Sequence, residues 1–243
     1  MAAQTLPVII TRAEPGTRET AARLLDSGLT PIPAPALYIE TNTSEDIPHH
    51  SDVSGLVFTS ANGVRCYVNR TNYFETPAWC VGPATAKAAR DSGFKTVHES
   101  AGNAVDLAKY IANHAGPTDK PLLHVANDAA KGDLKRELEK FGFGVEFCPL
   151  YHMRQSESLP AAAIEALESD LPALVLIHSA KGAEAFAKLA KNCATNQVIA
   201  VSISKQAANP LTSLDLKAVI VATAPNEDGL FGAINDAIAI LSA

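Results

Sequence analysis

Short apolar runs that lead directly into helical segments recur along this chain and constrain its fold most strongly. Residues 56–58 form one such run and continue through Thr59 and Ser60 into a helix-like segment, and residues 174–178 continue through Ser179 in the same way. Strands buried on both faces are continuously apolar, and strands that alternate with helices form parallel sheets. The pattern predicts an α/β protein with two similar parallel-sheet domains of the Rossmann or flavodoxin type.

Two similar extended segments predict where the domains divide. Residues 35–39 read Pro-Ala-Leu-Tyr-Ile, and residues 149–153 read Pro-Leu-Tyr-His-Met. We expect these segments to pair as a two-stranded linker, with linker strands at residues 35–40 and 148–154. The expected domains are then a discontinuous one, residues 1–36 and 154–243, and an inserted one, residues 40–148.

The composition indicates which classes of partner and which cellular compartment to expect. The formal net charge of −6 argues against nucleic acid as the main partner. No apolar run approaches the roughly 18–20 residues that a membrane span needs, and the N-terminus lacks a signal-peptide pattern. The four cysteines are scattered, which is typical of reduced thiols. We therefore expect a cytoplasmic protein that binds neither nucleic acid nor membrane.

The turns that follow the predicted strands are candidate binding sites for acidic groups. Ligands of parallel α/β sheets bind beyond the carboxyl ends of the strands, where helix N-termini offer free amides and a positive dipole. Ser60 and Ser179 are placed to cap their helices, and Arg12 and Lys181 add positive charge. The candidate binding residues at these turns are Arg12, Thr59, Ser60, Ala61, Asn62, Gly82, Ser179, Ala180, Lys181 and Ser202.

Several short motifs occur in an order and spacing that resemble the uroporphyrinogen-III synthase family over nearly the whole chain. They are Ile10-Thr11-Arg12, Val57-Phe58-Thr59-Ser60-Ala61-Asn62-Gly63-Val64, Val81-Gly82-Pro83-Ala84-Thr85-Ala86, Pro149-Leu150-Tyr151 and Ala222-Thr223-Ala224-Pro225-Asn226. Residues 123–126 followed by residues 131–134 resemble the alphaproteobacterial branch of that family.

The resemblance implies a fold and an activity. It implies two α/β domains joined by a two-stranded linker, with the active site in the cleft between them. The implied enzyme is a monomeric lyase of haem biosynthesis. It cyclises hydroxymethylbilane, a linear tetrapyrrole, to uroporphyrinogen III with inversion of ring D, and it uses no metal and no cofactor. A transient handover of substrate from hydroxymethylbilane synthase fits this role.

The resemblance also implies roles for particular residues. Tyr151 matches the linker tyrosine of the family and is the expected catalytic proton donor, although it could instead be a packing residue of the linker. Thr85 matches a threonine that would contact a substrate carboxylate, with helix capping as the alternative. Ser202 stands where many relatives have a different turn sequence, so the resemblance implies a binding role for Ser202 less directly than for the other residues. For Arg12 the alternative is an ion pair with Glu14.

Two other functions compete with this hypothesis. A non-catalytic two-domain binder of a small polyanion would use the same helix N-termini. A nucleotide-sugar enzyme would need a phosphate loop or a base-binding carboxylate, and neither motif occurs. His49 and His50 are conceivable metal ligands without an evident third partner. His178 ends a buried strand and is expected to be a hydrogen-bonded structural residue, with a ligand contact near the cleft as the alternative.

Overall fold

A computed structural model describes residues 6–130 and 133–241, and the chain in it divides into two compact units. Unit 1 comprises residues 1–39 and 154–243, and unit 2 comprises residues 40–153. Each unit is built on one sheet, and its strand pairs are parallel apart from the pair of β3 and β8 described below. The predicted fold class, two α/β parallel-sheet domains, is confirmed. Lys131 and Gly132, part of a motif quoted above, lie outside the described residues.

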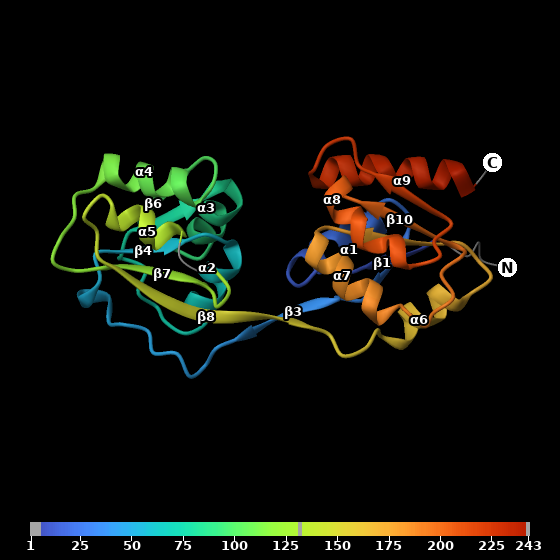
Figure 1. Cartoon of the computed structure of the whole chain (residues 1–243), viewed down its shortest axis with the longest axis horizontal. Coiled ribbons are helices and arrows are strands. Elements are labelled where there is room, and N and C mark those ends of the chain that lie inside the picture. Colours follow the sequence, from blue (N-terminus) through green and yellow to red (C-terminus); the bar gives the residue numbers. More distant parts are fainter. Residues whose placement is uncertain (1–5, 131–132, 242–243) are drawn as a thin grey trace. The chain divides into compact units, whose positions relative to one another are not determined.

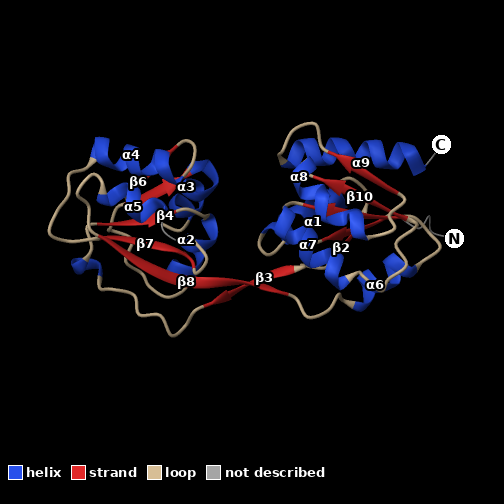
Figure 2. Cartoon of the chain, in the orientation of Figure 1, coloured by secondary structure: helices blue, strands red, loops and turns tan. Residues whose placement is uncertain are grey.

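Unit 1 has a five-stranded sheet with the order β11-β10-β9-β1-β2, covered by helices on both faces (Figures 1 and 2). The sheet combines strands from both segments of the unit: β1 and β2 come from the N-terminal segment, and β9, β10 and β11 come from the C-terminal segment. Its elements are β1 (Pro7–Ile10), α1 (Gly16–Asp26), β2 (Thr30–Pro33), α6 (Ala161–Glu168), β9 (Ala173–Ile177), α7 (Ala180–Leu189), β10 (Val198–Ser202), α8 (Lys205–Ala208), the 3-10 helix η2 (Asn209–Ser213), β11 (Ala218–Val221) and α9 (Glu227–Leu241).

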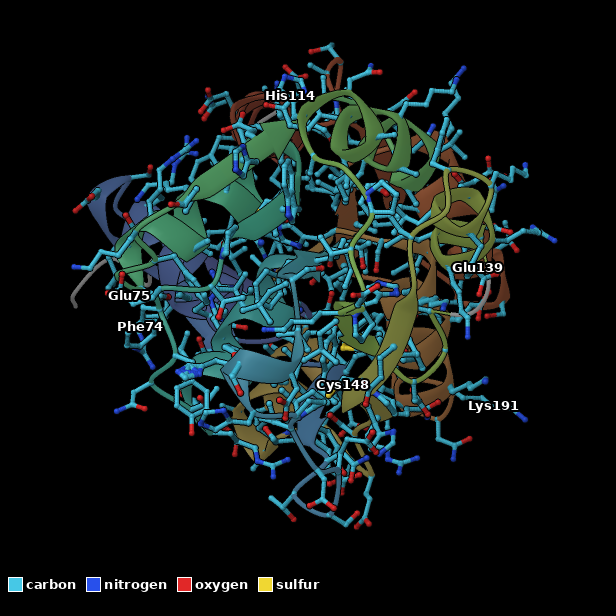
Figure 3. The ribbon with its side chains drawn as sticks, turned by 90° about the vertical axis from the view of Figure 1, so that its left-hand side faces the viewer. Phe74, Glu75, His114, Glu139, Cys148 and Lys191 are labelled. Carbon is cyan, nitrogen blue, oxygen red and sulfur yellow. The ribbon has the colours of Figure 1, made fainter. Side chains whose placement is uncertain are left out.

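Unit 2 has a six-stranded sheet with the order β3-β8-β7-β4-β5-β6. Its elements are the 3-10 helix η1 (His50–Asp52), β4 (Gly55–Phe58), α2 (Ala61–Val68), β5 (Ala78–Val81), α3 (Gly82–Asp91), β6 (Val97–Ser100), α4 (Ala104–His114), β7 (Leu122–Asn127) and α5 (Asp133–Glu139), together with β3 (Leu37–Thr41) and β8 (Val145–Gln155). Charged side chains such as Glu139 lie at its surface, whereas Cys148 of β8 is buried (Figure 3).

The two extended segments belong to neighbouring strands, β3 and β8. The Asn42 amide donates to the Leu150 carbonyl at 2.8 Å, and the Ser156 amide donates to the Ala36 carbonyl at 3.0 Å. As residue numbers rise on one strand they fall on the other, so the two strands run antiparallel. β8 is one continuous strand of 11 residues, longer than the separate strand and linker expected from the sequence (Figure 1).

Alternate residues of each central strand in unit 1 pack against different helices. Ile9 and Val175 belong to a core cluster with Phe186 of α7, whereas Ile10 and Leu176 belong to a cluster with residues of α1 and α9. All of these strand residues are fully buried. Burial on both faces explains why the strands are continuously apolar and lack alternation.

The strands of unit 2 are covered in the same way. Val57 of β4 packs with Leu107 of α4 and Leu138 of α5 on one face. Its neighbour Phe58 meets Tyr67 of α2 on the other face, with ring centroids 5.8 Å apart. Each unit therefore has helices on both sides of a central sheet.

Several elements differ from the sequence-based expectation. The sequence of residues 127–141 predicts one charged helix, and within the described residues this segment contains the shorter helix α5 (Asp133–Glu139). Helices α6, α8 and η2 were not anticipated, because segments of 8, 4 and 5 residues are too short to show a clear helical periodicity. Within the described residues, no helix is both long and apolar enough to cross a membrane.

A matched pair of glycine substitutions tests the packing of α2 on the sheet. A Cβ on Gly63 would lie 2.8 Å from the backbone carbonyl of Val125, whereas a Cβ on Gly232 in α9 would meet nothing within 4 Å. Gly63→Ala should destabilise the protein by about 1–3 kcal/mol, because rigid backbone blocks the methyl group. Gly232→Ala should stabilise it by up to about 1 kcal/mol through helix propensity. Equal effects of the two changes in urea unfolding would contradict this packing.

Candidate functional site

The candidate residues of unit 2 follow the carboxyl ends of adjacent strands. Thr59 and Ser60 follow β4, and Gly82 follows β5, the next strand in the sheet. Tyr151 lies on β8, which is separated from β4 only by β7. The parallel order brings these residues to one edge of the sheet, as the sequence predicts.

Tyr151 and Ser60 are directly linked at this edge. The Tyr151 hydroxyl donates to Ser60 Oγ at 3.3 Å, and Ser60 Oγ also accepts the Asn62 amide at 3.0 Å. Ser60 is therefore the N-cap of α2, as predicted. The Asn62 side chain accepts from Arg65 Nη1 at 3.1 Å, and Ala61 is half-buried beside it.

A bulge in β8 sets the position of Tyr151. Ala126 of β7 pairs with Pro149, but the following Asn127 pairs with Tyr151, so Leu150 is an extra residue in β8. The Asp128 amide then donates to the Tyr151 carbonyl at 3.1 Å. Bulges redirect side chains at functional sites, and this one places the Tyr151 ring over the N-terminus of α2.

Burial keeps two groups at this edge uncharged. Tyr151 is 4% exposed, and this burial raises the pKa of its phenol, only partly offset by the hydrogen bond with Ser60. Burial also lowers the pKa of His124 to about 4. The His124 Nε2 atom lies 3.4 Å from Thr59 Oγ1, so a neutral imidazole supports that hydroxyl. Near neutral pH, Tyr151 is a protonated phenol.

The N-terminus of α3 lacks a side-chain cap. Its N-cap residue is Val81, and Gly82 has a φ of +70°, which favours glycine. Thr85 is buried in the first turn, and its hydroxyl forms no hydrogen bond within the described part of the chain. Thr85 is thus not a capping residue, and the free amides of this turn suit an anionic group.

In unit 1, four side chains converge at the carboxyl edge of the sheet. Arg12 follows β1, His178 follows β9, Thr20 lies on α1, and Glu227 begins α9. Arg12 Nη1 is 3.2 Å from Glu227 Oε2, and the Thr20 hydroxyl donates to Glu227 Oε1 at 2.7 Å. Arg12 therefore pairs with Glu227, and the alternative partner Glu14 is wrong.

Charge and burial act in opposite directions on Glu227. Burial raises the pKa of this carboxyl, but His178, Thr20 and Arg12 together outweigh it and lower the pKa to about 2. His178 Nε2 lies 3.6 Å from Glu227 Oε2, an ion-pair distance beyond hydrogen-bond range. Both ring nitrogens of His178 are buried without a hydrogen bond, so the structural hydrogen bond expected for His178 is not found.

The other turns of unit 1 differ in their accessibility. Ser179 caps α7 by accepting the Gly182 amide at 3.0 Å, and the adjacent Ala180 is half-buried. Lys181 is exposed and, among residues 6–130 and 133–241, forms no ion pair. Ser202 is fully buried, and its hydroxyl donates to the Ser204 carbonyl at 3.0 Å. Ser202 is thus committed to its own turn.

The sequence interpretation missed Thr20 and Glu227. Thr20 lies 207 residues from its partner Glu227, and no local pattern links the two. The available signal was an acidic residue in the first turn of the last helix. The first turn of α9 also requires a glycine, since a Cβ on Gly229 would clash with the Ala224 carbonyl oxygen.

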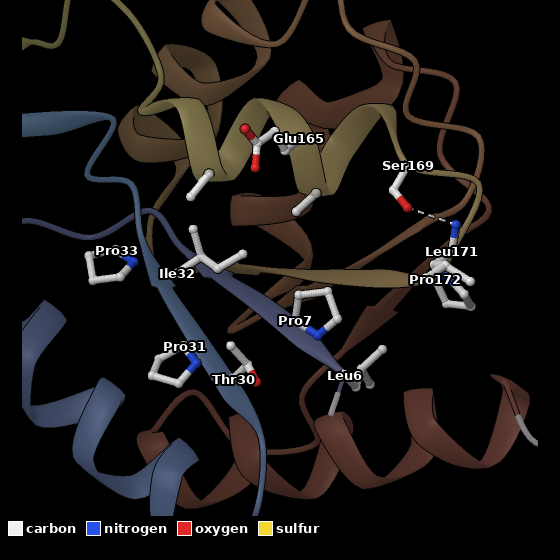
Figure 4. A pocket seen from close by; sticks show the side chains of 12 residues that line it. Leu6, Pro7, Thr30, Pro31, Ile32, Pro33, Glu165, Ser169, Leu171 and Pro172 are labelled. Carbon is white, nitrogen blue, oxygen red and sulfur yellow. Dashed lines mark hydrogen bonds between the residues drawn. The ribbon is translucent and has the colours of Figure 1, made fainter. Parts of the chain in front are cut away.

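A separate apolar groove of about 670 Å³ lies elsewhere on unit 1 (Figure 4). Leu6, Pro7, Thr30 and Pro172 of its lining lie at the amino ends of β1, β2 and β9. The candidate residues occupy the opposite ends of these strands. Within the described residues, no group of three or more His, Cys, Asp or Glu side chains is arranged to hold a metal ion.

Comparisons with known proteins agree on one family. The family model for uroporphyrinogen-III synthase HemD matches residues 18–232. A uroporphyrinogen-III synthetase structure from Helicobacter pylori 26695 is similar at a TM-score of 0.65 and 15% identity, covering 96% of this chain and 99% of that one. A mutant uroporphyrinogen III synthase from the extremely thermophilic bacterium Thermus thermophilus gives a TM-score of 0.50 at 14% identity, covering 98% and 99%. No curated protein matches the chain.

The depressed pKa of Glu227 predicts a pH-dependent contribution to stability. A carboxyl whose folded pKa lies below its unfolded value of about 4.3 stabilises the fold above that value. Its contribution is lost as pH falls toward about 2. Glu227→Gln should therefore cost about 1–2 kcal/mol at pH 7, and the gap from the unmutated protein should narrow below about pH 4.5.

Urea unfolding followed by far-ultraviolet circular dichroism at several pH values would measure this gap. Fluorescence of Trp79, the single tryptophan of the chain, reports unit 2 and is the internal control, because Glu227 lies in unit 1. A gap that stays constant from pH 7 to pH 3 would contradict the assignment.

Proposed function

The chain belongs to the uroporphyrinogen-III synthase family, and we propose that the strand-end residues described above bind and cyclise its linear tetrapyrrole. The function is the cyclisation of hydroxymethylbilane to uroporphyrinogen III with inversion of ring D, a lyase reaction of haem biosynthesis. The substrate carries acetate and propionate groups, so the protein must offer many binding sites for single carboxylates, which we call carboxylate seats.

One observation carries the catalytic part of the proposal: the Tyr151 hydroxyl lies at the strand-end edge, 3.3 Å from Ser60 Oγ. Because the phenol pKa is raised by burial, Tyr151 holds its proton at neutral pH. Its hydrogen bond with Ser60 is near the long limit of such bonds. The phenol can therefore exchange this weak partner for a substrate oxygen at little cost.

The proton of Tyr151 has a defined use in the reaction. The terminal hydroxyl of the substrate must leave as water, and the C–O bond breaks as a proton reaches the oxygen and the pyrrole nitrogen supplies electrons. The far pyrrole then attacks the resulting azafulvene through its substituted carbon, giving a spiro intermediate that fragments and recloses. A proton released as the final ring regains aromaticity balances the one supplied. A donor near the leaving oxygen accelerates the first step.

The binding residues would hold the substrate in the geometry that the reaction needs. The amides at Gly82 and the Thr85 hydroxyl form one seat, and Ser60 with the α2 N-terminus forms a second. In unit 1, Ser179, Ala180 and Lys181 at the start of α7 form a third.

Seats fixed on rigid elements hold a flexible chain in one conformation. The linear substrate also closes spontaneously without inversion, so positioning is the larger contribution of the enzyme. Ser202 is left out of the proposed binding set because its hydroxyl is buried and engaged.

The proposal extends to the setting in which the enzyme acts. The enzyme works as a cytoplasmic monomer without metal or cofactor. A transient handover from hydroxymethylbilane synthase limits the time in which the substrate can close spontaneously. A non-catalytic polyanion binder would share the carboxylate seats but would need no proton donor.

A coupled assay tests the activity directly. Porphobilinogen and its deaminase generate hydroxymethylbilane, the protein is added in catalytic amounts, and the oxidised uroporphyrin isomers are separated. We expect the product to change from type I to type III. Only type I product from a folded protein would reject the enzyme and favour the non-catalytic binder.

Tyr151→Phe tests the proton donor. The rate of type III formation should fall by about tenfold to a hundredfold, the lower end of effects for a lost general acid, while the product stays type III because positioning is intact. Tyr67→Phe is the matched control: it removes a hydroxyl from another buried tyrosine of the same unit, whose pKa is raised by burial to about 12.

Tyr67→Phe should keep its activity within about twofold. Complete loss of activity in a folded Tyr151→Phe protein, or an equal loss in both variants, would show that the phenol of Tyr151 does not act as a modest proton donor.

A further inference from the structure

The carboxylate of Glu227 is held by groups that are well suited to bind any carboxylate. One oxygen accepts the Thr20 hydroxyl at 2.7 Å, and the other lies 3.2 Å from Arg12 Nη1 and 3.6 Å from His178 Nε2. Thr20 is fully buried, and both ring nitrogens of His178 are buried. A cation, a hydroxyl and an imidazole thus converge on a single carboxylate at the carboxyl edge of the sheet.

The position of Arg12 is built into the fold. A Cβ on Gly16 would clash with Arg12 Nε, so the Arg12 side chain packs directly over the first turn of α1 and would have to move if residue 16 carried a side chain. The Thr17 hydroxyl donates to the Arg12 carbonyl and fixes the backbone of the same turn. The Arg12 side chain is therefore packed against the first turn of α1 as well as paired with Glu227.

The Arg12 contacts are nevertheless long enough to exchange. Its Nη1 atom serves two acceptors, Glu227 Oε2 at 3.2 Å and Thr20 Oγ1 at 3.3 Å, both near the upper limit for hydrogen bonds. The side chains of Arg12 and Glu227 are 31% and 27% exposed, so water and ligands reach the pair. An incoming carboxylate would replace an equivalent one, and Glu227 would turn into solvent.

We propose that Arg12, Thr20 and His178 form a binding site for one substrate carboxylate and that Glu227 occupies this site when no substrate is bound. The inference rests on the proposed function, because it assigns a seat for one acid group of the same polyanion. Glu227 is then a specificity-determining residue. A simple monocarboxylate would have to displace the Glu227 carboxylate by itself. A polyanion that is already bound at other sites displaces it more easily, because its remaining carboxylates are held nearby.

Glu227→Gln tests the inference, because the amide keeps the shape and the Thr20 contact but loses the charge that holds Arg12. Glu14→Gln is the matched control: it removes one negative charge from an exposed side chain two residues from Arg12. Binding of uroporphyrin III, which carries the same acid groups as the substrate, is followed by its fluorescence. The KM for hydroxymethylbilane is measured in the coupled assay.

We expect Glu227→Gln to bind uroporphyrin III at least fivefold more tightly than Glu14→Gln and to show a KM lowered by a similar factor. The gain should vanish in the double variant Arg12→Gln/Glu227→Gln, because the freed partner is then missing. Glu227→Asp, which shortens the side chain and withdraws the carboxylate, provides a second variant with the same expected direction. Equal or weaker binding by both Glu227 variants would overturn the proposal.

The two arms separate this inference from the proposed function. If the unmutated protein forms no type III isomer, the proposed function fails, and the uroporphyrin binding arm still decides whether Glu227 competes for Arg12. If type III forms and KM rises in folded Glu227→Gln, Glu227 itself positions the substrate and the competition model is wrong.

Discussion

Pairing between β1 and β9 is the interaction on which unit 1 depends, because it joins the two separate segments of the chain that make up this unit. Ile9 is in register with Val175, and the Thr11 hydroxyl donates to the Leu176 carbonyl at 2.7 Å across 165 residues. Residues 8–10 of β1 and all of β9 are fully buried, so a slip in register would expose apolar groups and misplace both turns. The same pairing brings Arg12 and His178 side by side at the strand ends and so creates the cluster around Glu227.

The helix N-termini of this protein differ in whether a side chain caps them. The starts of α2 and α7 are satisfied by Ser60 and Ser179, whose hydroxyls accept backbone amides. The start of α3 has no such cap and leaves its amides to another partner. A capped turn still offers a hydroxyl for a ligand, whereas an uncapped turn offers the amides themselves. A polyanion can therefore be held by a protein whose own net charge is −6.

The sequence was sufficient for the architecture and for the helix caps, because those depend on local patterns. Continuous apolar strands predicted parallel sheets, and Ser60 and Ser179 were identified as caps from their positions alone. The partner of Arg12 was not predictable, since its neighbour Glu14 was as plausible as a residue 215 positions away. The position of Tyr151 was equally hidden, because one extra residue at Leu150 shifts the register of β8 without any change in composition.

The insertion of residues 40–153 between the two parts of unit 1 has a consequence for the order of events during synthesis. Unit 2 is contiguous and is complete as soon as β8 has left the ribosome, whereas β1 must wait for β9, more than 160 residues later. During that interval the edge of β1 that pairs with β9 has no partner strand. β2 carries Pro31 and Pro33, which lack amide hydrogens and discourage pairing with other nascent chains. The prolines therefore protect the outer edge of β2, whereas the other edge of β1 stays unpaired until β9 is translated.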